Sequence, residues 1–192
     1  MKQSTNVVLL GMVGIFCVSM GGGPYTQSVI GEKAPSFKLK KGRDVYSGMV
    51  IDEKTQTNAT RVCFYNPIDP ECREGGDPVG ETYLEAFRID QDANSKIRLK
   101  SILAIEILKV ADSKFFVSER HNNRRFLRVK VTFVNDPKKP VTRLVDPQIV
   151  LGYTEQTGEI VTVLLFKINK IESIKKVGEG VEKKEMAAAV GA

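Results

Sequence analysis

The chain has 192 residues, of which 42% are apolar and 27% are charged, and its formal net charge is +6. This composition excludes a disordered chain, and the length is sufficient for one domain with a substantial core or for two small ones. The single histidine, His121, excludes most His-dependent catalytic triads and nearly all zinc enzymes.

The N-terminal segment has the layout of a secretory signal peptide. Lys2 precedes an apolar run over residues 7–20, and small residues follow the run from Gly21. A short basic start, an apolar core and a small-residue break are typical of a cleaved export signal. We therefore expect residues 1–21 to be a leader cleaved after Gly21, and residues 22–35 to be a linker.

Two other interpretations of this leader stay open. The first is an uncleaved membrane anchor, although the apolar run is shorter than the roughly 20 residues that span a bilayer. The second is a lipoprotein leader in which Cys17 is lipidated, although the large Phe16 stands where a lipobox requires a small residue. Each interpretation places the rest of the chain outside the cytoplasm.

The first part of the β-rich domain, which we expect over residues 36–174, alternates apolar segments with polar turns. Residues 37–40 and 45–51 flank a Lys-Gly-Arg-Asp turn and predict a hairpin. The polar segment 52–60 predicts a loop. The further strands predicted here are 61–65 and 97–110, while residues 83–89 fit either a strand or a helical turn.

Cys63 and Cys72 enclose a segment that contains two prolines, Pro67 and Pro70. Prolines and an Asn-Pro step favour a chain that turns back on itself. In an oxidising compartment such a pair predicts a disulfide, which would stabilise a loop of this length by roughly 2–3 kcal/mol. A zinc site would require four ligands and a redox pair is usually Cys-x-x-Cys, so both alternatives are weaker.

The second part of the domain contains the clearest strand signal in the chain. From residue 127 to 133 apolar and polar side chains alternate, which predicts a strand with one buried and one exposed face. We expect the buried face to consist of Leu127, Val129, Val131 and Phe133. The segment 135–140 should end this strand, and the other strands predicted here are 115–117, 141–145, 148–153 and 159–168.

These segments together predict a mainly β fold, either an antiparallel sandwich or one or more small barrels of SH3-like or Lsm-like shape. Residues 102–107 resemble residues 168–173, since both contain Ile-x-x-Ile-Glu. One interpretation is a duplicated unit, with related halves at 36–110 and 111–174; the other is a coincidence in an Ile-rich chain. Residues 175–192 are charged and then small, and we expect a flexible tail.

No segment has the spacing of a known catalytic or cofactor-binding motif, so we expect no catalytic residue, no metal site and no cofactor. His121 lies in a polar basic segment, and we expect it to be a solvated loop residue. Paired carboxylates can cleave glycosides. The carboxylates near the cysteines, however, have no spacing that singles out a pair: Asp69, Glu71, Asp77 and Glu81.

A basic cluster beside the alternating strand is the best candidate for contact with an anionic partner. Arginine binds carboxylates and phosphates through paired hydrogen bonds. Export and the absence of interleaved aromatic residues argue against nucleic acid. The alternative interpretation is a solvated strand face without a partner. The cluster consists of Arg120, Arg124, Arg125, Arg128 and Lys130.

Two functional hypotheses follow from these observations. The first is a non-enzymatic structural or accessory subunit of a cell-envelope assembly, such as a secretion, pilus or surface complex, which binds other envelope proteins. The second is a soluble module that binds an anionic ligand, either a polysaccharide or a lipid headgroup. Both place the protein in the periplasm or cell envelope, in solution or associated with the membrane.

Overall fold

The computed structural model describes residue 34 and residues 38–39, 44–69, 78–91, 93–109 and 113–177. In these ranges the chain forms antiparallel strands and short 3-10 helices without an α-helix, which confirms the mainly β fold class. The strands are β1 (Tyr46–Ile51), β2 (Gln56–Tyr65), β3 (Tyr83–Phe87), β4 (Asn94–Arg98), β5 (Ile102–Leu108), β6 (Phe115–Ser118), β7 (Arg124–Phe133), β8 (Asp136–Val145), β9 (Val150–Thr154), β10 (Ile160–Leu164) and β11 (Lys170–Lys176). The 3-10 helices are η1 (Leu99–Ser101), η2 (Glu119–His121) and η3 (Leu165–Lys167).

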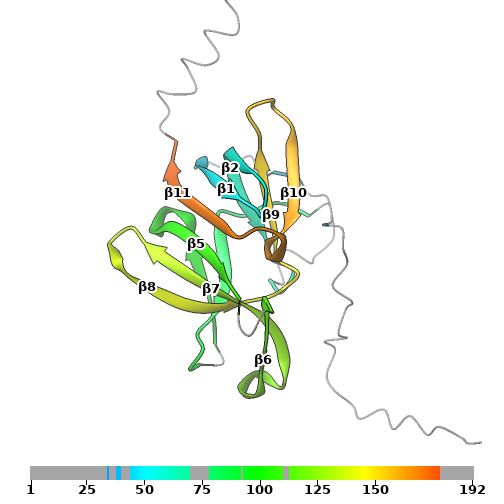
Figure 1. Cartoon of the computed structure of the whole chain (residues 1–192), viewed down its shortest axis with the longest axis vertical. Coiled ribbons are helices and arrows are strands. Elements are labelled where there is room, and N and C mark those ends of the chain that lie inside the picture. Colours follow the sequence, from blue (N-terminus) through cyan, green and yellow to red (C-terminus); the bar gives the residue numbers. More distant parts are fainter. Residues whose placement is uncertain are drawn as a thin grey trace, which may run out of the picture.

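All eleven strands belong to one open sheet with the order β10-β9-β2-β1-β11-β5-β7-β8-β3-β4, and β6 pairs with β7 beside this path. The order divides into two units of five strands. The outer unit consists of β1, β2, β9, β10 and β11; the inner unit consists of β3, β4, β5, β7 and β8. The strands of the inner unit lie in the sequence between β2 and β9. In Figure 1 the outer unit forms the upper part of the molecule, and β11 lies beside β5 where the units meet.

The spatial arrangement of corresponding strands is the same from either end of the sheet. A hairpin lies at the end (β9–β10 or β3–β4), a second hairpin follows (β1–β2 or β7–β8), and a single strand lies at the junction (β11 or β5). In each unit a hairpin leads through a one-turn 3-10 helix into the strand at the junction, as β4–η1–β5 and as β10–η3–β11. The first residue of each 3-10 helix donates its backbone N–H to the residue just before a corresponding strand: Leu99 to Thr82 O and Leu165 to Ile149 O, both at 2.9 Å. The two units are therefore equivalent in topology and in this hydrogen bond.

The two Ile-x-x-Ile-Glu segments meet at the centre of this arrangement. Ile105 and Ile171 are directly paired across the β5–β11 junction, and both are fully buried. The division predicted at residues 110 and 111 does not match the units, because β1 and β2 pair with strands from the end of the chain. The inner unit is an insertion within the outer one rather than a neighbour in sequence.

β2 connects two parts of the outer unit because it bends in the middle. Its first residues pair with β1, whereas its last residues pair with β9. The register with β9 shifts between Thr60 and Cys63, and Arg61 between them has a φ of 52°, in the left-handed region. A bulge of this kind bends the strand and increases its twist. The polar segment predicted as a loop is mostly the first half of β2, because Ala59 supplies a buried anchor there.

Other predicted boundaries also change. β1 pairs with β2 and β11 rather than with the segment 37–40. In that segment Lys38 forms a parallel bridge to Val79, and residues 37 and 40 lie outside the described residues. The predicted strand 97–110 is interrupted by η1, and 159–168 is interrupted by η3. β8 begins at Asp136 and contains both prolines of the segment that we expected to end β7; its first five residues are exposed.

One main hydrophobic core joins the two units. It contains Val50 and Leu151 from the outer unit together with Leu84 and Val129 from the inner unit. Since burial of apolar surface is the dominant stabilising term, this shared core couples the units into one body. The side chain of Lys114 adds a polar link: its Nζ donates to the carbonyl oxygens of Phe166, at 2.9 Å, and Ile168, at 3.2 Å. Partial burial lowers the pKa of this amine.

Candidate functional site

β7 and its neighbours distribute the predicted basic cluster over two faces of the sheet. The alternation on β7 is confirmed: Leu127, Val129 and Val131 are fully buried, while Phe133 at the strand end is only partly buried. Side chains an even number of residues apart share a face, so Arg124, Arg128 and Lys130 lie together on the opposite face. Arg125 has the opposite parity and lies over the ring of Phe115, at 5.8 Å. Arg120 is exposed in η2.

Arg124 is a structural residue. Its guanidinium forms an ion pair and hydrogen bond with Asp146, whose side chain is only 8% exposed. It also lies over the rings of Phe87, at 5.7 Å, and Phe126, at 5.3 Å. Asp146 in turn accepts the backbone N–H of Gln148 at 2.7 Å. This arginine therefore neutralises a buried carboxylate that follows β8, a role that the sequence pattern did not indicate.

The remaining cations on this face are also held within the protein. The guanidinium of Arg128 stacks over Phe116 at 4.3 Å, close enough for a favourable cation–π contact. Its Nε is buried and donates no hydrogen bond within the described part of the chain. Lys130 forms a half-exposed ion pair with Glu106 on β5 at 2.9 Å. Four of the five residues of the cluster, Arg124, Arg125, Arg128 and Lys130, are therefore paired or stacked within the protein.

His121 is not the solvated loop residue that we expected. Its ring packs edge-on against Phe87, at 5.7 Å, and Phe126, at 5.2 Å. Both ring nitrogens lie at hydrogen-bond distance from a partner: Nδ1 from Ser118 Oγ at 2.7 Å, and Nε2 from Gln91 O at 3.1 Å. The imidazole thus fixes η2 against the β3–β4 hairpin. Phe126 lies on β7, which directly follows η2, but Phe87 and Gln91 come from the β3–β4 hairpin, and the local composition around His121 does not record these contacts.

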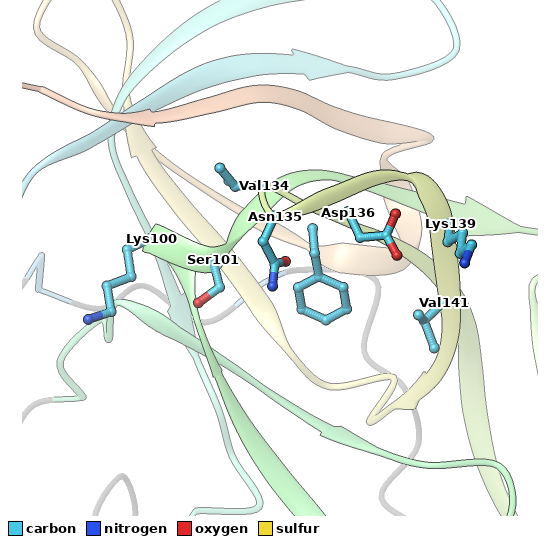
Figure 2. Close-up of a pocket in the computed structure, with 8 residues that line it drawn as sticks. Lys100, Ser101, Val134, Asn135, Asp136, Lys139 and Val141 are labelled. Atoms are coloured by element: carbon cyan, nitrogen blue, oxygen red, sulfur yellow. The ribbon is translucent and has the colours of Figure 1, made fainter.

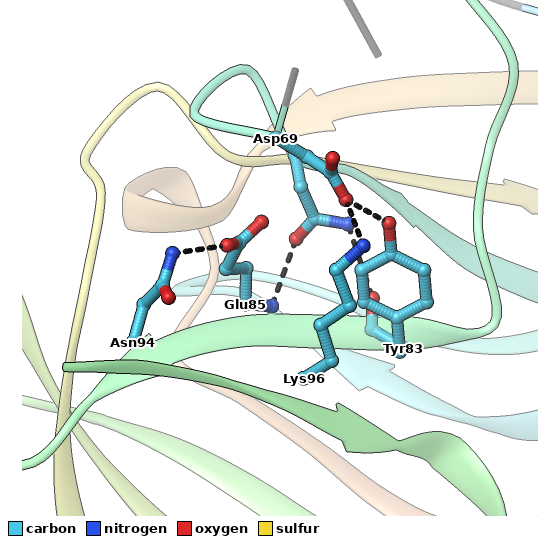
Figure 3. A network of polar contacts seen from close by, with 6 residues as sticks. Asp69, Tyr83, Glu85, Asn94 and Lys96 are labelled. Atoms are coloured by element: carbon cyan, nitrogen blue, oxygen red, sulfur yellow. Dashed lines mark hydrogen bonds and ion pairs between the residues drawn. The ribbon is translucent and has the colours of Figure 1, made fainter. Parts of the chain in front are cut away.

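A second polar group joins the segment after β2 to β3 and β4. Asp69 is 1% exposed; it accepts a hydrogen bond from the Tyr83 hydroxyl and forms an ion pair with Lys96 at 2.7 Å. Asn94 donates to the carboxylate of Glu85, which is also buried (Figure 3). Asp69 thus holds the segment after β2 against the β3–β4 hairpin, whereas the Glu85–Asn94 bond lies within that hairpin. Of the other carboxylates near the cysteines, Glu81 lies in the bridge to Phe64, and Glu71 and Asp77 lie outside the described residues.

An open groove of about 690 Å³ lies where η1 meets the β7–β8 hairpin. Val134, in the hairpin turn, is 53% exposed at this groove. Figure 2 shows Lys100 and Lys139 at the two ends of the row of lining side chains, with Ser101 and Asn135 between them. The full lining is Lys100, Ser101, Phe133, Val134, Asn135, Asp136, Lys139 and Val141. Sequence analysis missed this site, because its walls come from segments separated along the chain.

The structure does not contain the predicted Cys63–Cys72 disulfide. Cys63 is a free, buried cysteine on β2 whose thiol donates to the carbonyl of Gly152 on β9, at 3.7 Å. Burial, with a further contribution from the negative charge of Glu81, raises the pKa of this thiol to about 12. The side chain points toward β9 and packs with Val150 and Leu164. Its predicted partner, Cys72, lies outside the described residues.

We expect Cys63 to be unreactive toward thiol reagents in the folded protein. At about pH 8.5 an exposed cysteine is half ionised and reacts readily, whereas the buried thiol stays protonated. Iodoacetamide should modify Cys63 only after the protein is denatured, and it should do so without any added reductant. Peptide mass spectrometry detects the modification. Labelling that requires reductant in the denatured chain would instead establish the disulfide. Cys63→Ala provides the assignment control.

The described residues contain neither a candidate metal site nor a candidate membrane-spanning helix. There, no group of three or more His, Cys, Asp and Glu side chains is arranged to hold a metal ion. Within the same ranges no helix has the length and apolar character needed to cross a bilayer. No family model matches the chain, and comparisons with curated proteins and with solved structures find no significant match.

Proposed function

We propose that this chain is an exported structural or accessory subunit of a cell-envelope assembly and that it acts by protein–protein contact. The groove between η1 and the β7–β8 hairpin is the observation that carries the proposal. It combines exposed apolar surface at Val134 with two flanking lysines, Lys100 and Lys139. Apolar contact in the centre with polar groups at the rim is the usual composition of a protein interface.

The chemistry of the groove favours an extended partner segment with apolar and acidic side chains. The apolar side chains would contact Phe133, Val134 and Val141, and an acidic one would lie near Lys100. At the other end of the groove Asp136 lies next to Lys139 and offsets its charge. Export is supported by Lys2 and the apolar run over residues 7–20, which favour a mature chain beginning near Gly22. N-terminal sequencing of the native protein distinguishes this start from an anchored or Cys17-lipidated chain.

We expect Val134→Glu to abolish partner binding while leaving the fold intact. The substitution places a charge in the apolar centre of the groove, where an interface residue contributes most. Val117 offers a matched control, because it is the same residue with almost the same exposure, 52% against 53%, on β6. Tagged full-length chains would be recovered from detergent-solubilised envelopes of the native source, and stoichiometric partners would be quantified by mass spectrometry.

The expected result is at least about a tenfold loss of the co-purifying partner for Val134→Glu and no loss for Val117→Glu. Equal recovery with both variants would exclude the groove as the contact site. A wild-type chain that brings down no stoichiometric partner would contradict the proposed function itself.

The second candidate function is binding of an anionic polysaccharide or lipid headgroup. It is favoured by Arg128, whose guanidinium forms no ion pair with a carboxylate of the described residues and stacks on Phe116 instead. A stacked guanidinium is held in place and retains its charge for an external anion. Co-sedimentation with phosphatidylglycerol vesicles, compared with phosphatidylcholine vesicles, distinguishes this function from the first. Such binding would weaken as salt is added.

A further inference from the structure

The two ends of the sheet are equivalent in topology and opposite in chemistry. β4 and β10 occupy the same position in the inner and outer units, and each is a terminal strand of the sheet. Every residue of β4 except Ile97 is exposed and polar, and Lys96 and Arg98 are among them. Charged side chains, especially lysine, are the usual protection of an edge strand against pairing with another chain.

Among the residues that the structure describes, nothing gives β10 this protection. Its sequence is Ile-Val-Thr-Val-Leu, without a charge or a proline, and Ile160 is 55% exposed. It pairs with β9 in an unbroken register over all five residues, so no bulge turns the edge away. Figure 1 shows β10 at the margin of the outer unit, beyond β9. Alternate backbone N–H and C=O groups of such an edge strand point away from the sheet and can accept another strand.

We propose that β10 is a dimerisation edge, at which two copies of this chain pair antiparallel and continue the sheet from one copy into the other. Pairing centred on Thr162 places Val161 opposite Val163 of the second copy. Cross-strand pairs of β-branched residues stabilise a sheet. The contact is isologous, since the same strand serves on both sides.

The charges that flank β10 favour the antiparallel arrangement. Glu159 precedes the strand, and Lys167, in η3, follows it; both are exposed. In an antiparallel pair the acidic end of one strand lies beside the basic end of the other, whereas a parallel pair would bring like charges together. Because β4 at the opposite end is charged, the assembly stops at two copies and does not grow into a fibre.

Charge exchange at Thr162 tests this interface. Thr162→Lys and Thr162→Glu each place like charges directly opposite one another across the two-fold axis, which weakens pairing. A mixture of the two variants places lysine opposite glutamate and should restore it. Arg98→Glu, which alters the exposed edge of β4, is the matched control and should leave the dimer unchanged.

Sedimentation velocity of the full chain between about 1 and 100 μM measures the result. We expect a dimer for the wild type and for Arg98→Glu, at least about a tenfold weaker dimer for each Thr162 variant, and recovery in the mixture. A monomeric wild type throughout this range overturns the proposal. A dimer that both Thr162 variants leave unchanged also overturns it, because the interface then lies elsewhere.

Hydrogen exchange of the wild type provides a test that needs no variant. Amides of β10 that point away from β9 should become protected as the concentration rises through the dimerisation range, while those of β4 should not change. Exchange in β10 that is independent of concentration would contradict pairing at this edge.

Discussion

Val131→Asp should unfold the protein or destabilise it by more than about 4 kcal/mol. Val131 is fully buried on β7 between Ile105 on β5 and Val141 on β8, so a carboxylate there has neither water nor a cationic partner. Because these strands carry the junction between the two units, we expect loss of the whole sheet rather than local fraying. Urea denaturation followed by circular dichroism measures the effect, and failure to accumulate as soluble protein is the extreme form of it.

Thr132→Asp is the internal control for this result. Thr132 is the next residue on the same strand, but its side chain lies on the partly exposed opposite face. The same change should destabilise the protein by at most about 1 kcal/mol there. Similar losses at both positions would mean that β7 does not divide into a buried and an exposed face.

Arg124→Ala should destabilise the protein by about 2–4 kcal/mol. The substitution leaves the buried carboxylate of Asp146 without its cation and removes the stacking on Phe87 and Phe126. Breaking a buried ion pair from one side is more damaging than removing both charges, because the remaining charge stays desolvated. Equilibrium unfolding in urea gives the difference, with the exposed Arg125→Ala as the comparison.

A second variant identifies the cause of that loss. Adding Asp146→Asn to Arg124→Ala removes the stranded charge and keeps an oxygen that can accept the backbone N–H of Gln148. The double variant should therefore be more stable than Arg124→Ala alone. If it is no more stable, the contribution of Arg124 comes from its packing on the phenylalanine rings rather than from the ion pair.

The sequence contained enough information for the fold class and for the orientation of β7, because strict alternation on one strand is a local property. It did not contain the strand pairing. The prediction for β2 omits its first half, because that half is polar and only Ala59 is deeply buried there. The prediction for β8 omits its first five residues, because they are exposed. Both segments are strands because neighbouring strands supply their hydrogen bonds, which local composition does not record.

The basic cluster shows the same limit at the level of side chains. Arginines that are close together in sequence form an open cationic surface only when no other part of the protein pairs or stacks with them. Asp146 and Phe87 come from β8's end and from β3, so the ion pair and stacking of Arg124 depend on the tertiary fold. The groove beside η1 is likewise formed by segments distant in sequence, and no local pattern marks its lysines as neighbours.

The nesting of the inner unit within the outer one determines the order in which the protein can be completed. β1 is made early, yet its neighbour β11 is the last strand of the described part of the chain, so Val50 can pair with Ile171 only after most of that part has been made. During synthesis, β1 therefore has an unpaired side until β11 has been made. The inner unit has all its strands sooner, and it can nucleate the structure while the long loop between β1 and β11 closes slowly. A chain truncated before β11 would lose not only one strand but the last step that joins both units into a single sheet.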